Sequence, residues 1–396
     1  MSMDFLEAVE EQLVAATERG IKRRRWRRPL LWMQRLPLRA PTVGIAAGVG
    51  AALAASAIAA TLTLPASKSK PKPVEPAAVT AGTGATVRSF TTAGTVPVGF
   101  QPVSFTAISE FSWWLLGTAP CNGHTCTAIV RTTDGGPQFT RIAAPPTTNV
   151  QNVRFGNEDD GYAFGQQLWS TVDGGRSWTH QQPGSIVNDL QIAGDYVYAI
   201  AYRHSQTHLM SSAIGTNNWT TLGGLGRGYL SGLWVQGSTV FINSGTHLLV
   251  SDNGGASFRR VGGTHRVSDC TYDGGPQALW ALCSTGMAPD DILLSTNSGN
   301  TFTTAAQVPY GPIDSFAAAT GTVAVASSQG PLYRSGNAGA SWARVKAPSA
   351  NWIYLGFTDA THGVAIGGFG KGGMQDSRLY YTTDGGVSYH RVMIGP

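Results

Sequence analysis

Charged residues are scarce in this chain of 396 residues: Asp, Glu, Lys and Arg together make up 13% of it, about half the average share in globular proteins. Glycine is abundant, with 50 residues. This composition favours an all-β, turn-dense domain over a helical one, and the chain is long enough for a large core or for more than one domain.

A basic excess is missing from most of the chain, although the net charge is +5. Residues 1–40 hold nine basic and five acidic residues, and residues 65–97 hold four and one. The remaining part therefore has 15 basic and 17 acidic residues. A nucleic-acid-binding domain needs a basic face, so the charge distribution argues against a nucleic acid as partner.

Cysteine is limited to four residues, which suits an oxidising compartment. Cys270 and Cys283 flank an apolar stretch and would lie opposite each other in a hairpin, while Cys121 and Cys126 share one loop. We predict these two pairs among the three connectivities that four cysteines allow. A metal site with His124 between Cys121 and Cys126 lacks further ligands nearby, so we expect neither a metal nor a cofactor.

One long apolar run is present, Val43–Leu64, with 22 residues and no charge. A helix of about 33 Å would span the hydrocarbon core of a bilayer. Basic residues gather before the run, so residues 1–42 are predicted to be cytoplasmic and the rest extracytoplasmic. Residues 65–97 form a Pro-, Ala- and Lys-rich linker, which we expect to be extended. These segments predict a single-pass protein of a bacterial cell membrane, with the lipid bilayer as one partner.

Other interpretations of the N-terminal part remain open. The apolar run could belong to a cleaved signal peptide with Ala55-Ser56-Ala57 at the cleavage site, although 42 preceding residues are long for such a peptide. Gly44 and Gly48 form a GxxxG pattern that permits a helix-mediated dimer. Residues 1–21 have the spacing of a short amphipathic helix, either beside the membrane or docked to a cytoplasmic partner.

A turn motif recurs along the rest of the chain, and its best copy runs from Thr171 to Trp178. A hydroxyl residue is followed by Asp two positions later, by Gly after two more, and by an aromatic residue three beyond. The Asp side chain can accept bonds from the N–H groups of the turn. Six copies carry Asp or Asn at the second position: Asp134, Asp173, Asn253, Asn297, Asn337 and Asp384. A seventh, decayed copy has Ser212 and Trp219, but Ile214 and Thr216 replace the acid and the glycine.

The spacing of these copies predicts the fold. Their aromatic residues lie 39 to 47 residues apart, and a period near 40 with several short strands per unit is typical of propeller blades. We therefore predict an all-β, seven-bladed propeller over residues 98–396, with four strands per blade. Only four residues follow its last predicted strand, 389–392, so blades 1 and 7 should close by side-chain packing. Residues 87–90 are predicted to add an edge strand.

The motif resembles the Asp box, or BNR repeat, of sialidases, sortilin-type receptors and the photosystem II stability/assembly factor-like propellers of bacteria. Residues 153–165, with an acidic turn followed by Gly-Tyr-Ala-Phe-Gly before the box, are most similar to the last group. The resemblance covers residues 98–396. It implies a propeller in which the box is a structural turn and has no catalytic role.

The sialidases in this group have an Arg-Ile-Pro, an arginine triad, an acid/base Asp and a Tyr nucleophile assisted by Glu. Here Arg141-Ile142 is followed by Ala143, after the first box. The propeller region holds only two glutamates, Glu110 and Glu158. No catalytic residue is therefore predicted, and a surface glycoside hydrolase of the sialidase-like class is the alternative function.

Binding residues are expected on the loops between the second and third strands, which would open on one face of the ring. Four of these loops are predicted to be long: 119–126, 203–208, 285–291 and 367–378. They would present a rim of His124, Arg203, His204, His208, Asp290, Asp291, Lys371 and Asp376. The predicted function is a non-catalytic binding or assembly module for an extracytoplasmic protein or glycan.

Overall fold

A computed structural model of the chain describes residues 88–89, 94–182, 186–227, 230–244, 248–261, 270–275, 278–283, 290–309, 313–328, 330–369 and 376–395. All regular structure in these residues is β-strand. They contain no helix that is long and apolar enough to cross a membrane. The predicted cytoplasmic segment 1–42, the anchor 43–64 and most of the linker 65–97 lie outside the described residues.

Seven antiparallel sheets form the blades, and the four strands of each blade follow one another in sequence and in space. The strands of blades 1 to 3 are β2 (Gln101–Ala107), β3 (Trp113–Cys121), β4 (His124–Thr132), β5 (Thr140–Ile142); β6 (Val150–Phe155), β7 (Asp160–Gly165), β8 (Leu168–Val172), β9 (Ser177–Gln181); β10 (Ile186–Ala193), β11 (Tyr196–Arg203), β12 (Gln206–Ala213) and β13 (Thr220–Arg227).

The strands of blades 4 to 7 are β14 (Ser231–Gln236), β15 (Thr239–Asn243), β16 (Leu248–Ser251), β17 (Arg259–Val261); β18 (Cys270–Gly275), β19 (Ala278–Cys283), β20 (Asp291–Ser295), β21 (Thr303–Thr304); β22 (Ile313–Ala318), β23 (Ala324–Ser328), β24 (Leu332–Ser335), β25 (Ala343–Arg344); β26 (Asn351–Phe357), β27 (Gly363–Gly368), β28 (Ser377–Thr382) and β29 (His390–Val392). The predicted seven-bladed propeller is confirmed.

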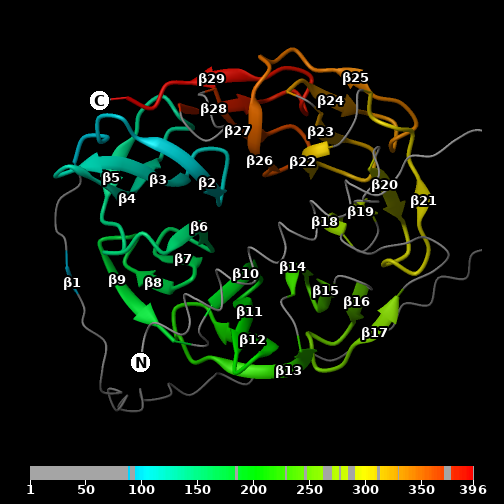
Figure 1. The fold of residues 1–396 in the computed structure, drawn as a ribbon, viewed down its shortest axis with the longest axis horizontal. Helices are drawn as coiled ribbons and strands as arrows, with labels where there is room; N and C mark the ends of the chain where they lie inside the picture. The colour runs from blue at the N-terminus through cyan, green and yellow to red at the C-terminus, as the bar shows by residue number, and fades with distance from the viewer. Residues whose placement is uncertain are drawn as a thin grey trace, which may run out of the picture. The chain divides into compact units, whose positions relative to one another are not determined.

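The blades are arranged in a ring around a central axis, with the first strand of each blade innermost and the fourth outermost (Figure 1). Contacts between the innermost strands run all the way around the ring, from β2 to β6 and onward to β26, which contacts β2 again. Each second strand lies between two neighbouring sheets, so both of its faces are covered. Accordingly, every residue of β23 and of β27 is buried.

Blade 7 closes against blade 1 by side-chain packing, as predicted. A buried cluster joins Phe105 and Leu115 of blade 1 to Ile366 and Leu379 of blade 7. The Trp113 and Tyr381 rings, one from each blade, lie 4.8 Å apart between centroids. Both sheets consist of their own four consecutive strands, so the seam depends on complementary side chains.

The chain enters the ring along its outer rim. β1 (Arg88–Ser89) pairs antiparallel with β9 and forms a fifth strand at the edge of blade 2, which confirms the predicted edge strand. Gly94 then exchanges two main-chain hydrogen bonds with Arg141 of β5, of 3.1 and 2.8 Å. Val96 follows and is buried in the cluster between blades 1 and 7. The segment before β2 is thus attached at three successive points.

Two of the predicted long loops are instead hairpins with longer strands. In blade 1, β3 and β4 have nine residues each and are joined only by Asn122 and Gly123. In blade 3, β11 and β12 have eight residues each and are joined by His204 and Ser205. All four turn residues have positive φ, between 47° and 79°, which matches the right-handed twist of hairpins. The predicted loops 119–126 and 203–208 were therefore wrong, because strand pairing continues to the tip.

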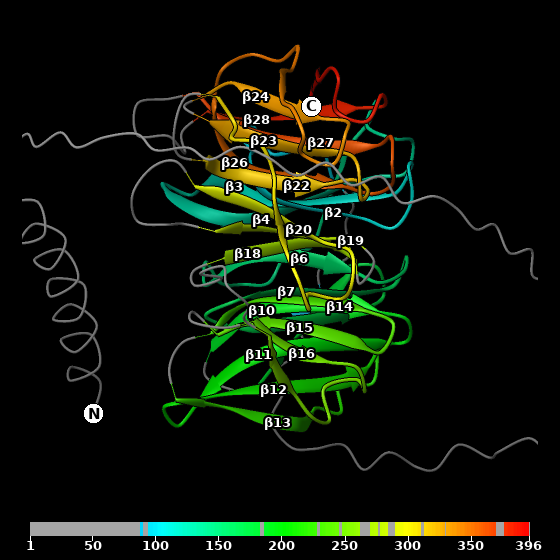
Figure 2. The ribbon, with the colours of Figure 1, turned by 90° about the vertical axis from the view of Figure 1, so that its right-hand side faces the viewer.

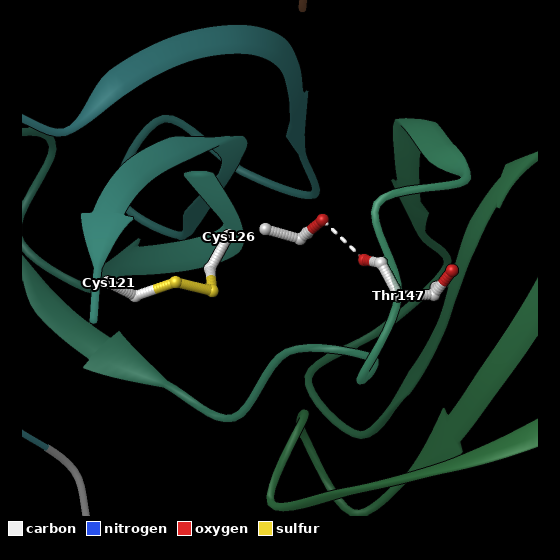
Figure 3. The surroundings of a disulfide bond; sticks show 4 residues. Cys121, Cys126 and Thr147 are labelled. Carbon is white, nitrogen blue, oxygen red and sulfur yellow. Dashed lines mark hydrogen bonds between the residues drawn. A yellow bond between two sulfur atoms is a disulfide. The ribbon is translucent and has the colours of Figure 1, made fainter. Parts of the chain in front are cut away.

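Both predicted disulfides are present. Cys270 lies directly opposite Cys283 on β18 and β19, with Cα atoms 4.0 Å apart. Cys121 and Cys126 bridge the hairpin of blade 1 diagonally, with a Cα distance of 5.9 Å. Next to this second bridge, the Thr127 hydroxyl donates to the Thr147 carbonyl on the connection to blade 2, at 2.5 Å (Figure 3).

Candidate functional site

Six turns between third and fourth strands share one hydrogen-bond pattern. At Thr171, the hydroxyl oxygen accepts from the Gly175 N–H at 2.9 Å and donates to Asp173 Oδ1 at 2.8 Å, and the same Oδ1 accepts from the Ser177 N–H. The corresponding bonds form at Asp134, Asn253, Asn297, Asn337 and Asp384. Because these side chains bond within their own turn, they are committed to holding it together.

Asp and Asn make the same fourth bond with opposite polarity. The Ser177 hydroxyl donates to Asp173 Oδ2 at 2.6 Å, whereas Asn253 Nδ2 donates to the Ser257 hydroxyl at 2.9 Å. At Asp384, burial raises the pKa, but hydrogen bonds from Ser388 and Thr382 outweigh it and lower the pKa to about 2. The acid is therefore a hydrogen-bond acceptor that an amide can replace.

The decayed seventh copy keeps only part of this turn. The Ser212 and Thr216 hydroxyls lie 3.2 Å apart, and no carboxyl or amide group replaces the missing Asp. Trp219 still packs edge-on against Tyr162 of the preceding blade, 6.3 Å between centroids. Blade packing thus survives the loss of the central acid.

The described members of the predicted rim lie on one face of the ring, where second strands turn into third strands and where the chain crosses between blades. Figure 2 shows the ring from the side, with connections emerging at its two faces. His124 opens β4, Arg203 ends β11, and His204 lies in the turn after it. Asp376 precedes β28, and Lys371 lies outside the described residues. The described rim residues come from blades 1, 3, 5 and 7.

Several rim residues make contacts within the propeller. Asp290 Oδ2 accepts from the Ile313 N–H at 2.8 Å and thereby links blade 5 to blade 6. Asp291 opens β20 opposite Cys283. His208 lies inside β12, opposite Ala201, and its buried Nδ1 has no hydrogen-bond partner.

Asp376 is paired with the Arg378 guanidinium, which covers the Phe369 ring at 4.6 Å. None of the described residues form a group of three or more His, Cys, Asp or Glu side chains that could hold a metal ion. Of the described rim residues, His124, Arg203 and His204 remain exposed at the hairpin tips.

A polar cleft of about 480 Å³ opens on the same face between blades 2 and 3. It lies where β9 ends and β10 begins, beneath the turn from β7 to β8 and beside the end of β11. Its lining side chains are Gln166, Gln167, Leu168, His180, Gln181, Gln182, Val187 and Arg203. Arg203 is thus the one predicted rim residue that borders it, and none of these lining residues carries a carboxylate.

A second group of titratable side chains lies on the innermost strands of four different blades. Burial raises the pKa of Asp189 on β10, and the charge of Arg154 on β6 partly opposes the rise. Burial also raises the pKa of Tyr354 on β26, where the charge of Arg154 lowers it and that of Asp273 on β18 raises it. These groups are therefore close enough to influence one another.

Asp189 and Asp273 each accept a hydrogen bond from a main-chain N–H of the next blade. Asp189 Oδ2 accepts from the Leu233 N–H, and Asp273 Oδ2 accepts from the Ala318 N–H, each at 2.8 Å. Ser104 of blade 1 accepts from the Val153 N–H of blade 2 in the same way, at 3.2 Å. At three places, therefore, a side chain on one innermost strand accepts a hydrogen bond from a main-chain N–H on the innermost strand of the next blade. These bonds hold neighbouring blades together near the centre of the ring.

Comparison with solved structures agrees with this architecture. The chain superposes on YCF48 bound to a D1 peptide with a TM-score of 0.54 and 17% identity, covering 76% of this chain and 96% of that one. The chain shares the propeller fold of YCF48. YCF48 from Cyanidioschyzon merolae gives a TM-score of 0.51 with 16% identity, covering 74% of this chain and 98% of that one.

A puromycin-hydrolysing peptidase of Mycobacterium tuberculosis gives a TM-score of 0.53 with 13% identity, covering 76% of this chain and 57% of the peptidase. At these identities the likeness establishes the fold, which proteins of different activity share. No family model matches the sequence, and no curated protein matches it.

The sequence predicted the rim residues. It did not predict the cleft between blades 2 and 3, nor the group formed by Arg154, Asp189, Asp273 and Tyr354 on the innermost strands. The cleft brings together two pairs of adjacent glutamines, Gln166-Gln167 and Gln181-Gln182, and nothing in the sequence marked either pair as part of a site. Asp189 offered a usable signal, since it is the one charged residue in the first strand of its blade. A charged side chain on an innermost strand needs either a hydrogen-bonding partner or contact with water.

Proposed function

We propose that the chain is a membrane-anchored, extracytoplasmic propeller that acts as a non-catalytic binding or assembly module for a protein partner. The observation that carries this proposal is the use of the acids: Asp189, Asp273 and Asp290 each accept a main-chain N–H of the neighbouring blade. These carboxylates hold the scaffold together. The exposed groups of the rim and of the cleft are then left to recognise a partner.

The fold supports the same proposal. YCF48 was solved with a bound D1 peptide, which is an example of peptide binding by a propeller of this architecture. The apolar run 43–64 and the basic residues before it support anchoring, with the propeller held outside the membrane by the linker.

Two experiments test the proposal. The full chain with a C-terminal tag is purified from a detergent extract of its own cells, with an untagged strain as control, and a stable protein partner is expected. Recovery of no partner after crosslinking would contradict the binding role. Protease treatment of intact cells without their outer layers should remove the tag, and a protected tag would contradict the proposed orientation.

A glycoside hydrolase of the sialidase-like class is a second candidate, favoured by one observation. Arg154, Asp273 and Tyr354 lie on the innermost strands of blades 2, 5 and 7, and the charges of Arg154 and Asp273 act on the Tyr354 hydroxyl. These are residue types that sialidases use. Turnover of a fluorogenic sialoside by the full chain, abolished in Tyr354→Phe, would establish this function. Absence of turnover in the wild-type protein would remove it.

A further inference from the structure

We propose that the polar cleft between blades 2 and 3 binds the carboxylate of an acidic peptide segment, with Arg203 as the anion-binding group. This inference rests on the proposed function and names the site and the chemistry of recognition. It is argued from the lining groups, from their existing bonds and from the shape of the cleft.

Charge gives the first argument. Arg203 is the single arginine or lysine among the lining residues and no carboxylate accompanies it. Its side chain has neither an ion-pair nor a hydrogen-bond partner among the described residues, whereas Arg131, Arg259 and Arg378 are each paired with an acid. A free guanidinium presents a planar fork of donors that matches a carboxylate. The cleft therefore lacks the negative charge that a ligand would supply.

The glutamines give the second argument, because part of their hydrogen-bonding capacity is already used. The Trp169 indole N–H donates to Gln167 Oε1 at 3.1 Å, so the Gln167 NH₂ group is left as a donor. Gln181 Nε2 donates to the Ser170 hydroxyl at 3.1 Å, so Gln181 Oε1 is left as an acceptor. One oriented donor and one oriented acceptor suit the C=O and N–H groups of a peptide backbone.

Shape gives the third argument. Leu168 and Val187 are buried and form an apolar base, and the His180 ring packs against Trp169 with 4.9 Å between centroids. A volume of about 480 Å³ falls within the range of ligand sites, about 300 to 1,000 Å³. A few peptide residues fit such a space, with their carboxylate toward Arg203.

The test measures binding to the full chain in detergent by fluorescence anisotropy. The probe is a fluorescein-labelled pentapeptide with two aspartates and an amidated C-terminus, and the same peptide with asparagines is the comparison. We expect the aspartate peptide to bind more tightly, and Arg203→Gln to weaken its binding about fivefold. Arg260→Gln is the matched control, since Arg260 is exposed on the outermost strand of blade 4, and it should leave binding unchanged.

Three outcomes would overturn the inference: equal binding of both peptides, equal binding to wild type and Arg203→Gln, or binding of a uronic acid disaccharide in place of the peptide. Both variants are first shown to have wild-type melting temperatures. The purification of the tagged chain distinguishes failure of the binding role from failure of the cleft as the binding site. If Arg203→Gln retains that partner in full, the cleft assignment fails and the binding role stands; if wild type recovers none, the binding role itself fails.

Discussion

Replacing Asp173 tests whether the box acid acts as a hydrogen-bond acceptor or as a charge. Its side chain accepts bonds from the Thr171 hydroxyl, the Ser177 N–H and the Ser177 hydroxyl, at 2.8, 2.9 and 2.6 Å. Asp173→Ala removes all three and leaves a half-buried N–H without a partner. At about 1 kcal/mol per bond, partly offset by solvent, the free energy of unfolding should fall by about 2 kcal/mol.

Asp173→Asn should lower the free energy of unfolding much less, by less than about 0.5 kcal/mol. The amide can donate to the Ser177 hydroxyl, where the carboxylate accepts from it. In the Asn boxes, Asn253 Nδ2 donates to Ser257, and Asn297 Nδ2 donates to Thr301 in the same way. Melting temperature by calorimetry is the assay. A loss of about 2 kcal/mol corresponds to roughly 3 °C in a domain of this size. Asp195 is an exposed acid in the turn between β10 and β11 of blade 3. Asp195→Ala is the control and should leave the melting temperature unchanged.

Acid titration adds a second test to the same pair of variants. Burial raises the pKa of Asp173, but the hydrogen bonds from Ser177 and Thr171 outweigh it and lower the pKa below its usual value. The folded state therefore favours the ionised form, and the stabilisation is present above about pH 4 and is lost as the pH falls through the lowered pKa. The difference between wild type and Asp173→Asn should shift in favour of Asn below pH 4. Equal destabilisation by Asn and Ala at pH 7 would refute the hydrogen-bond explanation and show that the charge is required.

Three further predictions concern the scaffold. Trp113→Ala at the seam of blades 1 and 7, where Trp113 is 1% exposed, should cost about 3 to 5 kcal/mol in unfolding experiments. Trp169→Ala should cost clearly less, because Trp169 is half-buried and packs against His180; equal losses would contradict closure by packing. Mild reduction followed by alkylation and mass spectrometry should label exposed Cys126 before Cys270, which is 1% exposed, and the reverse order would contradict the placement of the two disulfides. Asp273→Ala should lower the melting temperature, since the Ala318 N–H of the next blade loses its acceptor at a cost of about 1 to 3 kcal/mol; an unchanged melting temperature would show that this bond does not contribute.

The number of blades was predictable because the same turn motif, which needs particular residue types, recurs along the chain, once in a decayed form. A hydroxyl, an acid or amide and a glycine are all needed for the bonds at Thr171 and Asp173, so the repeat is visible in the sequence. The turn needs glycine at its fifth position, where Gly175 has φ of 84° and an added Cβ would lie 2.6 Å from Ile142. Local chemistry of this kind survives the divergence of the surrounding residues.

The candidate site was less predictable because it depends on the stacking of blades. The cleft collects residues from the ends of three strand connections, and nothing in the local sequence relates Gln167 to Arg203. The hairpin of blade 1 was misread because Thr125, Cys126 and Thr127 lie on exposed or half-exposed strand, without the apolar alternation that marks a buried strand. Strand pairing that continues beyond the hydrophobic core produces no recognisable hydrophobic pattern in the sequence.

The attachment of the entering chain to the outer rim has a mechanical consequence. A pull on the chain before Arg88 reaches the two residue pairs of β1 and β9 first, then the double bond between Gly94 and Arg141, and only then Val96 in the closing cluster. Because β1 and Gly94 lie on two neighbouring sheets, the load is shared between blades 1 and 2 before any of it reaches β2. Tension on this segment would therefore break the rim contacts first, and the seam between blades 1 and 7, which no strand crosses, would bear load only after those contacts have separated.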